Sequence, residues 1–330
     1  MKTSKSSLIT GIIIGIAIII AVAIILRTAM TVDKKTTIGN AFIYDINELT
    51  KTDPNLIKYK EINKIKTELQ NPTGIATDSN DRIYVSGDKS IKIFDNQGNI
   101  ESEIKLTDYP KCLAVADDGN IYVGMKEHLE IYNQSGSRIA KWESLGTNAL
   151  ITSVDANKDN VFVADAIGKK VLIYDLSGNQ KNSIGKFIIP SPYFDLDVAL
   201  DGLLWIVNPG PHKLEAYTLD GNMQLSWGET SIGIKGFSGC CNPVSFAILP
   251  DGRFVTAEKG VPRVKVYSNT GVFESVVAGA EAFKDTVGVY NPDDTKDTRK
   301  ALDVAVDSIG RILILDPIEK TVRIFISNKE

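Results

Sequence analysis

From residue 72 onward, short apolar strands alternate with polar turns, and one unit of this pattern recurs along the chain. Each unit begins with an apolar stretch and passes an Asp, Asn or Gly turn. It continues through a β-branched and aromatic strand, a short polar loop, and another strand that ends in Phe or Tyr. Several strands alternate apolar and polar residues with a period of two, as half-buried strands do. The pattern predicts an all-β fold for this region.

Six copies of the unit are present, and their second strands begin at residues 83, 121, 161, 204, 254 and 312. Four strands per unit at a spacing of about 40 residues are typical of a β-propeller. We therefore predict a six-bladed β-propeller over residues 55–330. The two longest intervals place insertions at about residues 228–239 and 279–300, and insertions on one face of a repeat protein often mark its binding side.

The sixth unit ends at residues 327–330, before any fourth strand. A closed ring therefore needs an outer strand from elsewhere in the chain, and residues 57–69 can supply it. This pairing would join both ends of the propeller in one blade and remove an exposed sheet edge.

The start of the chain carries a separate apolar segment. Residues 8–26 are 19 consecutive residues without a charge, between a short tail at 1–7 and a linker at 27–54. This length reaches across a bilayer core. A cleaved signal peptide is the alternative, but its apolar region is shorter, roughly 7 to 15 residues. We expect a single transmembrane helix that anchors the protein in the cell (inner) membrane, with the propeller outside the cytoplasm, in the periplasm.

Composition narrows the choice of partners. The formal net charge is -4, and the 37 Lys and Arg residues are scattered along the chain. Binding to a phosphate backbone needs a basic patch, so nucleic acid is not an expected partner. The 3 Cys and 2 His residues are too few for a Cys-rich disulfide framework or a zinc ribbon.

Three segments carry a resemblance to a known family. Residues 71–78, residues 163–174 and residues 257–267 resemble NHL repeats, which build six-bladed propellers. The resemblance extends over residues 57–330 and implies the fold more strongly than the function. The family includes binding scaffolds, a zinc-dependent lyase and relatives of metal-dependent lactonases.

Oxygen-bearing side chains follow the second strands of four consecutive units: Asp165, Asn208, Glu258 and Asp316. Hard cations such as Ca²⁺ take these ligands, so a divalent cation is the one cofactor that the pattern indicates. A metal-dependent hydrolase or lactonase is the corresponding alternative function. The resemblance to NHL repeats offers a structural reading instead, because in such repeats the acid pairs with a base across the loop. His128 and His212 make an incomplete zinc set, since catalytic zinc generally takes three protein ligands.

Two adjacent cysteines, Cys240 and Cys241, lie at the start of the fifth unit. Adjacent α-carbons are about 3.8 Å apart, below the usual disulfide range, so a bond between these residues would be strained and comparatively reducible. Three interpretations stay open: a vicinal disulfide, reduced buried thiols, or attachment of a soft metal or cofactor. A redox-associated module is the function that the first interpretation indicates.

The loops at the start of the fifth unit and after its second strand share one face of the propeller. We expect the surface that binds a ligand or partner to contain six residues of these loops: Cys240, Cys241, Asn242, Glu258, Lys259 and Arg263. The sequence thus favours a membrane-anchored scaffold over an enzyme. We expect this scaffold to bind a small ligand or a protein, and a subunit of a membrane complex is one form that it can take.

Overall fold

The structure, a computed structural model, describes residues 14–16, 18–25, 27, 50–283 and 301–328. The chain divides into two units, Met1–Ile46 and Asn47–Glu330. Among the described residues, no helix has both the length and the apolar character that a membrane crossing requires. The predicted anchor at residues 8–26 lies partly outside the described residues, as does the predicted linker at 27–54.

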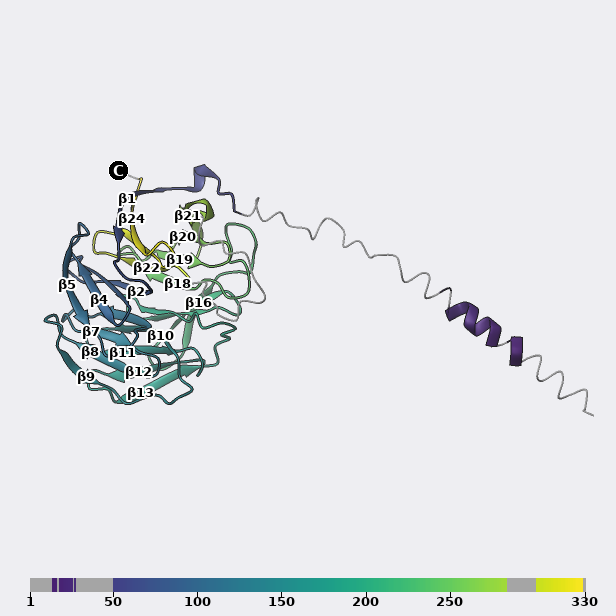
Figure 1. Cartoon of the computed structure of the whole chain (residues 1–330), viewed down its shortest axis with the longest axis horizontal. Coiled ribbons are helices and arrows are strands. Elements are labelled where there is room, and N and C mark those ends of the chain that lie inside the picture. The colour runs from purple at the N-terminus through teal and green to yellow at the C-terminus, as the bar shows by residue number, and fades with distance from the viewer. Residues whose placement is uncertain (1–13, 17, 26, 28–49, 284–300, 329–330) are drawn as a thin grey trace, which may run out of the picture. The chain divides into compact units, whose positions relative to one another are not determined.

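The second unit is a six-bladed propeller of four-stranded antiparallel sheets (Figure 1). The innermost strand of each blade contacts the innermost strands of both neighbouring blades, which closes the ring. From the axis outward, blade 1 contains β2 (Pro72–Thr77), β3 (Ile83–Gly87), β4 (Ser90–Phe94) and β5 (Ile100–Lys105). Blade 2 contains β6 (Cys112–Val115), β7 (Ile121–Gly124), β8 (Leu129–Tyr132) and β9 (Arg138–Lys141). Blade 3 contains β10 (Ile151–Ala156), β11 (Asn160–Asp165), β12 (Lys170–Asp175) and β13 (Gln180–Gly185). Blade 4 contains β14 (Leu196–Val198), β15 (Leu204–Asn208), β16 (Lys213–Tyr217) and β17 (Met223–Trp227). Blade 5 contains β18 (Ser245–Ile248), β19 (Phe254–Glu258), β20 (Arg263–Tyr267) and β21 (Phe273–Ala278). Blade 6 contains β22 (Asp303–Val306), β23 (Ile312–Asp316), β24 (Thr321–Ser327) and, as its outermost strand, β1 (Tyr59–Lys66).

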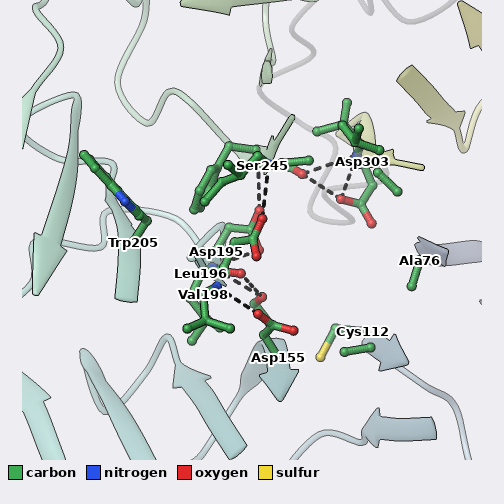
Figure 2. A pocket seen from close by; sticks show the side chains of 18 of the residues that line it. Ala76, Cys112, Asp155, Asp195, Leu196, Val198, Trp205, Ser245 and Asp303 are labelled. Atoms are coloured by element: carbon green, nitrogen blue, oxygen red, sulfur yellow. Dashed lines mark hydrogen bonds between the residues drawn. The ribbon is translucent and has the colours of Figure 1, made fainter. Parts of the chain in front are cut away.

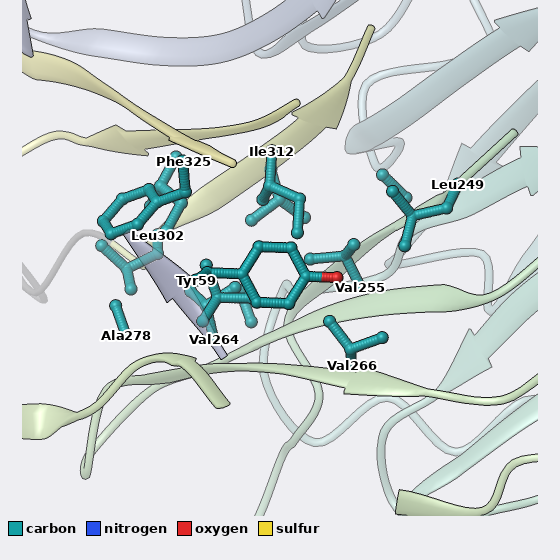
Figure 3. Close-up of a cluster of buried hydrophobic side chains, with 14 of the residues drawn as sticks. Tyr59, Leu249, Val255, Val264, Val266, Ala278, Leu302, Ile312 and Phe325 are labelled. Atoms are coloured by element: carbon teal, nitrogen blue, oxygen red, sulfur yellow. The ribbon is translucent and has the colours of Figure 1, made fainter. Parts of the chain in front are cut away.

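The hydrophobic core consists of six clusters, one at each interface between adjacent blades. Successive residues of a strand point to opposite faces of its sheet. In β3, Ile83 and Val85 therefore pack toward blade 6, whereas Tyr84 packs toward blade 2. The second strand of each blade is mostly apolar because both of its faces are covered. Figure 3 shows the cluster between blades 5 and 6.

The predicted ring closure is confirmed. β1 pairs antiparallel with β24 along its length, from Tyr59 opposite Ser327 to Lys66 opposite Thr321. Tyr59 is buried in the cluster between blades 5 and 6, and Figure 3 shows its ring among those side chains. Ile65 is buried in the next cluster, between blades 6 and 1. The N-terminal strand thus completes a sheet and also fills two blade interfaces.

An insertion between β17 and β18, residues 228–242, follows blade 4 as predicted. Thr230 and Phe237 form an isolated bridge within it, and Phe237 is fully buried against the rings of Trp227 and Tyr267. The second predicted insertion is described only as far as a short 3-10 helix, η3 (Ala280–Phe283), and the rest lies outside the described residues. A second such helix, η2 (Pro54–Leu56), precedes β1.

Candidate functional site

A cavity of about 1200 Å³ lies among the six innermost strands. Four of the aspartates that line it come from three blades and bond to the neighbouring blade: Asp155 in β10, Asp195 immediately before β14, Asp197 in β14, and Asp303 in β22. Figure 2 shows three of these four, together with Ser245 and Cys112. The carboxyl groups are deep in the molecule, yet they remain partly exposed to the cavity.

The alternation of the innermost strands places these side chains toward the axis. In Asp195-Leu196-Asp197, Leu196 is buried between blades 3 and 4, so the flanking aspartates point the other way, into the cavity. Our sequence analysis missed these residues. A polar-apolar-polar triplet in the first strand of a blade was the available signal.

Each carboxylate accepts a hydrogen bond from a backbone amide of the next blade. The distances are 2.8 Å from Val198 N to Asp155, 2.9 Å from Phe246 N to Asp195, 3.2 Å from Ile248 N to Asp197 and 3.1 Å from Ile75 N to Asp303. These amides lie on the free edge of an innermost strand, and a buried amide without a partner costs stability. The carboxylates therefore satisfy the inner edges and join neighbouring blades around the axis.

The pKa values of the four carboxyl groups are raised, mainly because the groups are buried and partly because they lie close to one another. Burial raises the pKa of Asp195 to about 7, and the nearby charge of Asp303 adds to this. Burial also raises the pKa of Asp155 to about 6. The pKa of Asp197 lies well above its ordinary value because of burial and then the charge of Asp155, and burial raises the pKa of Asp303 as well. The cavity therefore holds protonated carboxyl groups near neutral pH, which can donate as well as accept hydrogen bonds.

The six residues that we expected on the binding surface divide into two groups. Glu258, Arg263, Asn242 and Cys241 are buried. Arg263 Nη2 lies 2.9 Å from one Glu258 carboxylate oxygen, and Lys265 Nζ lies 2.8 Å from the other. Asn242 bonds the backbone of Ser238 and of Lys259. These side chains hold the insertion onto blade 5.

Lys265 is the central residue of this anchor, and the sequence analysis did not single it out. Its fully buried ammonium group also donates to the carbonyl oxygens of Ile234 (3.1 Å) and Gly236 (2.7 Å). It lies over the ring of Phe237, 4.7 Å from the centroid. Burial lowers the pKa of Lys265 to about 8, although the charge of Glu258 opposes this shift.

The second group is more accessible: Cys240 is exposed and Lys259 is half-buried. Lys259 Nζ donates to the Ser191 hydroxyl at 3.1 Å and lies 4.4 Å from the centroid of the Tyr193 ring. Tyr193 lines the axial cavity. The residues around the cysteine pair thus extend to the cavity wall.

The predicted metal ligands accept hydrogen bonds from backbone amides of nearby loops. Asp165 accepts from Leu150 N and Gly168 N, Asn208 accepts from Ile188 N, and Asp316 accepts from Ile318 N and Glu319 N. In the part of the chain that the structure describes, no group of three or more His, Cys, Asp or Glu residues could hold a metal ion. Of the expected acid–base pairs, the Glu258–Arg263 ion pair is formed.

The two histidines do not fit a zinc site. His212 is buried, with Nδ1 2.9 Å from the Phe237 carbonyl oxygen, where it supports the insertion. His128 Nε2 lies 3.4 Å from a carboxylate oxygen of Glu130, in blade 2. Each imidazole thus has a local structural partner.

Solved structures with the same architecture include virginiamycin B lyase from Staphylococcus aureus. It is 11% identical over 81% of this chain and 98% of its own, with a TM-score of 0.53. A streptogramin B lyase structure is 11% identical over 84% of this chain and 100% of its own (TM-score 0.55). A protein of unknown function from Bacteroides caccae is 15% identical over 62% and 81%, respectively (TM-score 0.50). At these identities the similarity is one of fold.

No protein-family model and no curated protein matches the sequence. The resemblance to NHL repeats therefore stays a prediction. The predicted six-bladed propeller is confirmed, and its fold is similar to that of virginiamycin B lyase.

Proposed function

We propose that this protein is a membrane-tethered binding propeller whose axial cavity takes a small cationic ligand. One observation carries the proposal, namely the charge imbalance of the cavity. Among the described residues that line it are eight aspartates and a single lysine, Lys111, and two of the aspartates, Asp78 and Asp307, pair with an arginine outside the cavity. A concave site with convergent polar groups and shifted pKa values is a typical binding site.

The cavity suits such a ligand in size and chemistry. Its volume of about 1200 Å³ is slightly above the usual range of small-molecule sites, about 300–1,000 Å³, so a small ligand fits within it. An amine can donate hydrogen bonds to Asp195 and Asp303, and its positive charge favours the ionised form of both carboxyl groups. Aromatic side chains that also line the cavity, Tyr193 and Trp205, add apolar contact area.

Thermal unfolding of the detergent-purified full-length protein tests this proposal. A ligand that binds the native state stabilises it by mass action. We expect putrescine or cadaverine to raise the melting temperature above that in NaCl of equal ionic strength. The double variant Asp195→Asn/Asp303→Asn should lose this shift, and Asp159→Asn, an exposed carboxylate, should keep it. If both cations act no better than NaCl, the cavity does not bind small cations.

The proposed tether is residues 8–26, which contain no charged side chain over a length sufficient for a bilayer. The full chain should stay with the membrane after alkaline carbonate washing, and a chain without residues 1–26 should be released. Protease added outside intact cells, after the outer membrane is permeabilised, should digest an extracytoplasmic propeller. A propeller that is protected until the inner membrane is lysed would contradict the proposed orientation.

A further inference from the structure

The cysteine pair offers chemistry that ligand binding in the cavity does not use. Cys240 Sγ and Cys241 Sγ lie 2.8 Å apart, and both residues are free thiols. They differ sharply in exposure, because Cys240 is exposed whereas Cys241 is 1% exposed. Two sulfurs in contact can exchange a bond, but only Cys240 can meet a reactant from solution.

The backbone on both sides of the pair is held in place. The Asn242 amide group donates to the carbonyl oxygens of Ser238 (2.6 Å) and Lys259 (3.0 Å), and its oxygen accepts from Lys259 N (2.8 Å). On the other side, Ser238 N donates to Glu258 at 3.2 Å. The two sulfurs are thus kept together by a buried network and not by chance in a loose loop.

A cation lies beside the buried thiol. Burial and a hydrogen bond with Cys240 raise the pKa of Cys241, while a hydrogen bond with Ser191 and the positive charge of Lys259 partly offset this rise. Lys259 is itself positioned by Ser191 and by the Tyr193 ring. A thiolate formed at Cys241 would therefore have a fixed counter-charge nearby, and thiolates are the reactive form of cysteine.

We propose that Cys240 and Cys241 form a thiol–disulfide exchange site for small-molecule disulfides, with Cys240 as the attacking thiol and Cys241 as the resolving thiol. The Cys240 thiolate attacks one sulfur of the disulfide, forms a mixed disulfide and releases the first thiolate. The Cys241 thiolate then attacks Cys240 Sγ, closes the Cys240–Cys241 bond and releases the second. The two leaving thiolates take up the two cysteine protons, so the protein is oxidised by two electrons and the small disulfide is reduced to two thiols. Lys259 is a positioning residue that stabilises the Cys241 thiolate.

Reaction of the reduced full-length protein with oxidised glutathione, followed by acid quenching and mass spectrometry, tests the assignment. The wild-type protein should lose two hydrogen atoms, localised to the peptide that contains Cys240 and Cys241, with a transient glutathionyl adduct on Cys240. Cys241→Ser should stop at a stable adduct on Cys240. Cys240→Ser should not react while folded, because Cys241 is buried. Cys112→Ala, which removes the other buried thiol, should behave as the wild type.

The role of Lys259 is tested by the pH profile of the second step. Lys259→Met should move that profile to higher pH and leave the first step unchanged, while Lys259→Arg should retain the wild-type profile. A shift of one pKa unit corresponds to a roughly tenfold change in rate below the pKa, because the thiolate fraction changes by that factor. An unmoved profile in Lys259→Met would remove Lys259 from the assignment.

Two results would overturn the exchange site itself. One is a glutathionyl adduct that persists in the folded wild-type protein. The other is a Cys240→Ser variant that reacts as fast as the wild type. Circular dichroism of each variant separates these results from a failure to fold. None of these measurements uses a cavity ligand, so the exchange site and the proposed cation binding succeed or fail separately.

Discussion

Asp195 couples the stability of the propeller to pH. Its carboxyl group faces Asp303, Asp197 and the Cys112 thiol, and burial together with the charge of Asp303 raises its pKa to about 7. Between the ordinary value of 3.8 and about 7, the native state binds more protons at this site than the unfolded chain does. The stability that Asp195 contributes is therefore complete below about pH 3.8 and is lost as the pH rises through about 7.

We expect Asp195→Asn to stabilise the protein at pH 8 by up to about 4 kcal/mol, since the pKa of Asp195 rises from 3.8 to about 7 and each pKa unit corresponds to about 1.4 kcal/mol. At pH 5 the variant and the wild type should differ much less. Urea unfolding at both pH values measures this, with Asp159→Asn as the exposed control. Equal stabilities of Asp195→Asn and the wild type at pH 8 would show that the fold does not hold this carboxyl group in its protonated form.

The sequence points to some residues of the candidate site but not to the carboxylates that line the axial cavity. Cys240 and Cys241 stand out because adjacent cysteines are chemically unusual wherever they occur. Asp195 and Asp197 do not, because β14 is only three residues long and an Asp-Leu-Asp triplet also suits a turn. Their importance arises from position, since only the innermost strand presents side chains to the axis.

One strand of blade 5 makes three of the side-chain contacts that position the insertion at residues 228–242. β20 supplies Arg263, Lys265 and Tyr267, and all three bond to residues of the insertion. Lys265 alternates with Val264 and Val266, so its place in the sequence matched a solvent-exposed strand position. The insertion covers that face of the strand, so Lys265 is buried and bonds to the insertion.

Lys265→Met should therefore destabilise the protein by about 3 kcal/mol, the usual cost of removing one partner from a buried ion pair. Met retains most of the apolar stem, so the loss comes from the unpaired oxygens of Glu258, Ile234 and Gly236. Urea unfolding gives the free energy, and limited proteolysis should show faster cleavage within residues 228–242. Lys235→Met, at an exposed position of the same insertion, serves as the control and should leave both measurements unchanged. Wild-type resistance to proteolysis in Lys265→Met would mean that the insertion is held mainly by its apolar contacts.

The strands themselves were predictable because the propeller buries both faces of its middle strands. Ile83, Tyr84 and Val85 are all buried, two of them in one blade interface and one in the next, so the strand reads as a continuous apolar run. The outer strands read differently. β17, for example, is exposed at four of its five positions, and its sequence alone would not establish a strand.

Closure of the ring makes the whole propeller depend on β1. This strand covers the edge of β24 and inserts Tyr59 and Ile65 into two blade interfaces, and Arg323 of β24 pairs with Glu61 of β1. Burial of each apolar side chain is worth about 1.5–3 kcal/mol. The strand thus stabilises blades 5, 6 and 1 together.

A chain without residues 1–69 should lose cooperative unfolding or aggregate, because it exposes the β24 edge and leaves two interfaces unfilled. A chain without residues 1–46, which removes only the first unit, is the matched control and should melt in one cooperative transition. Adding the β1 segment as a peptide of residues 50–69 should restore part of the stability of the shorter chain, because the edge that it pairs with is then present and open. Cooperative melting of the shorter chain at the temperature of the control would mean that five complete blades hold the ring without β1, and that ring closure adds little stability.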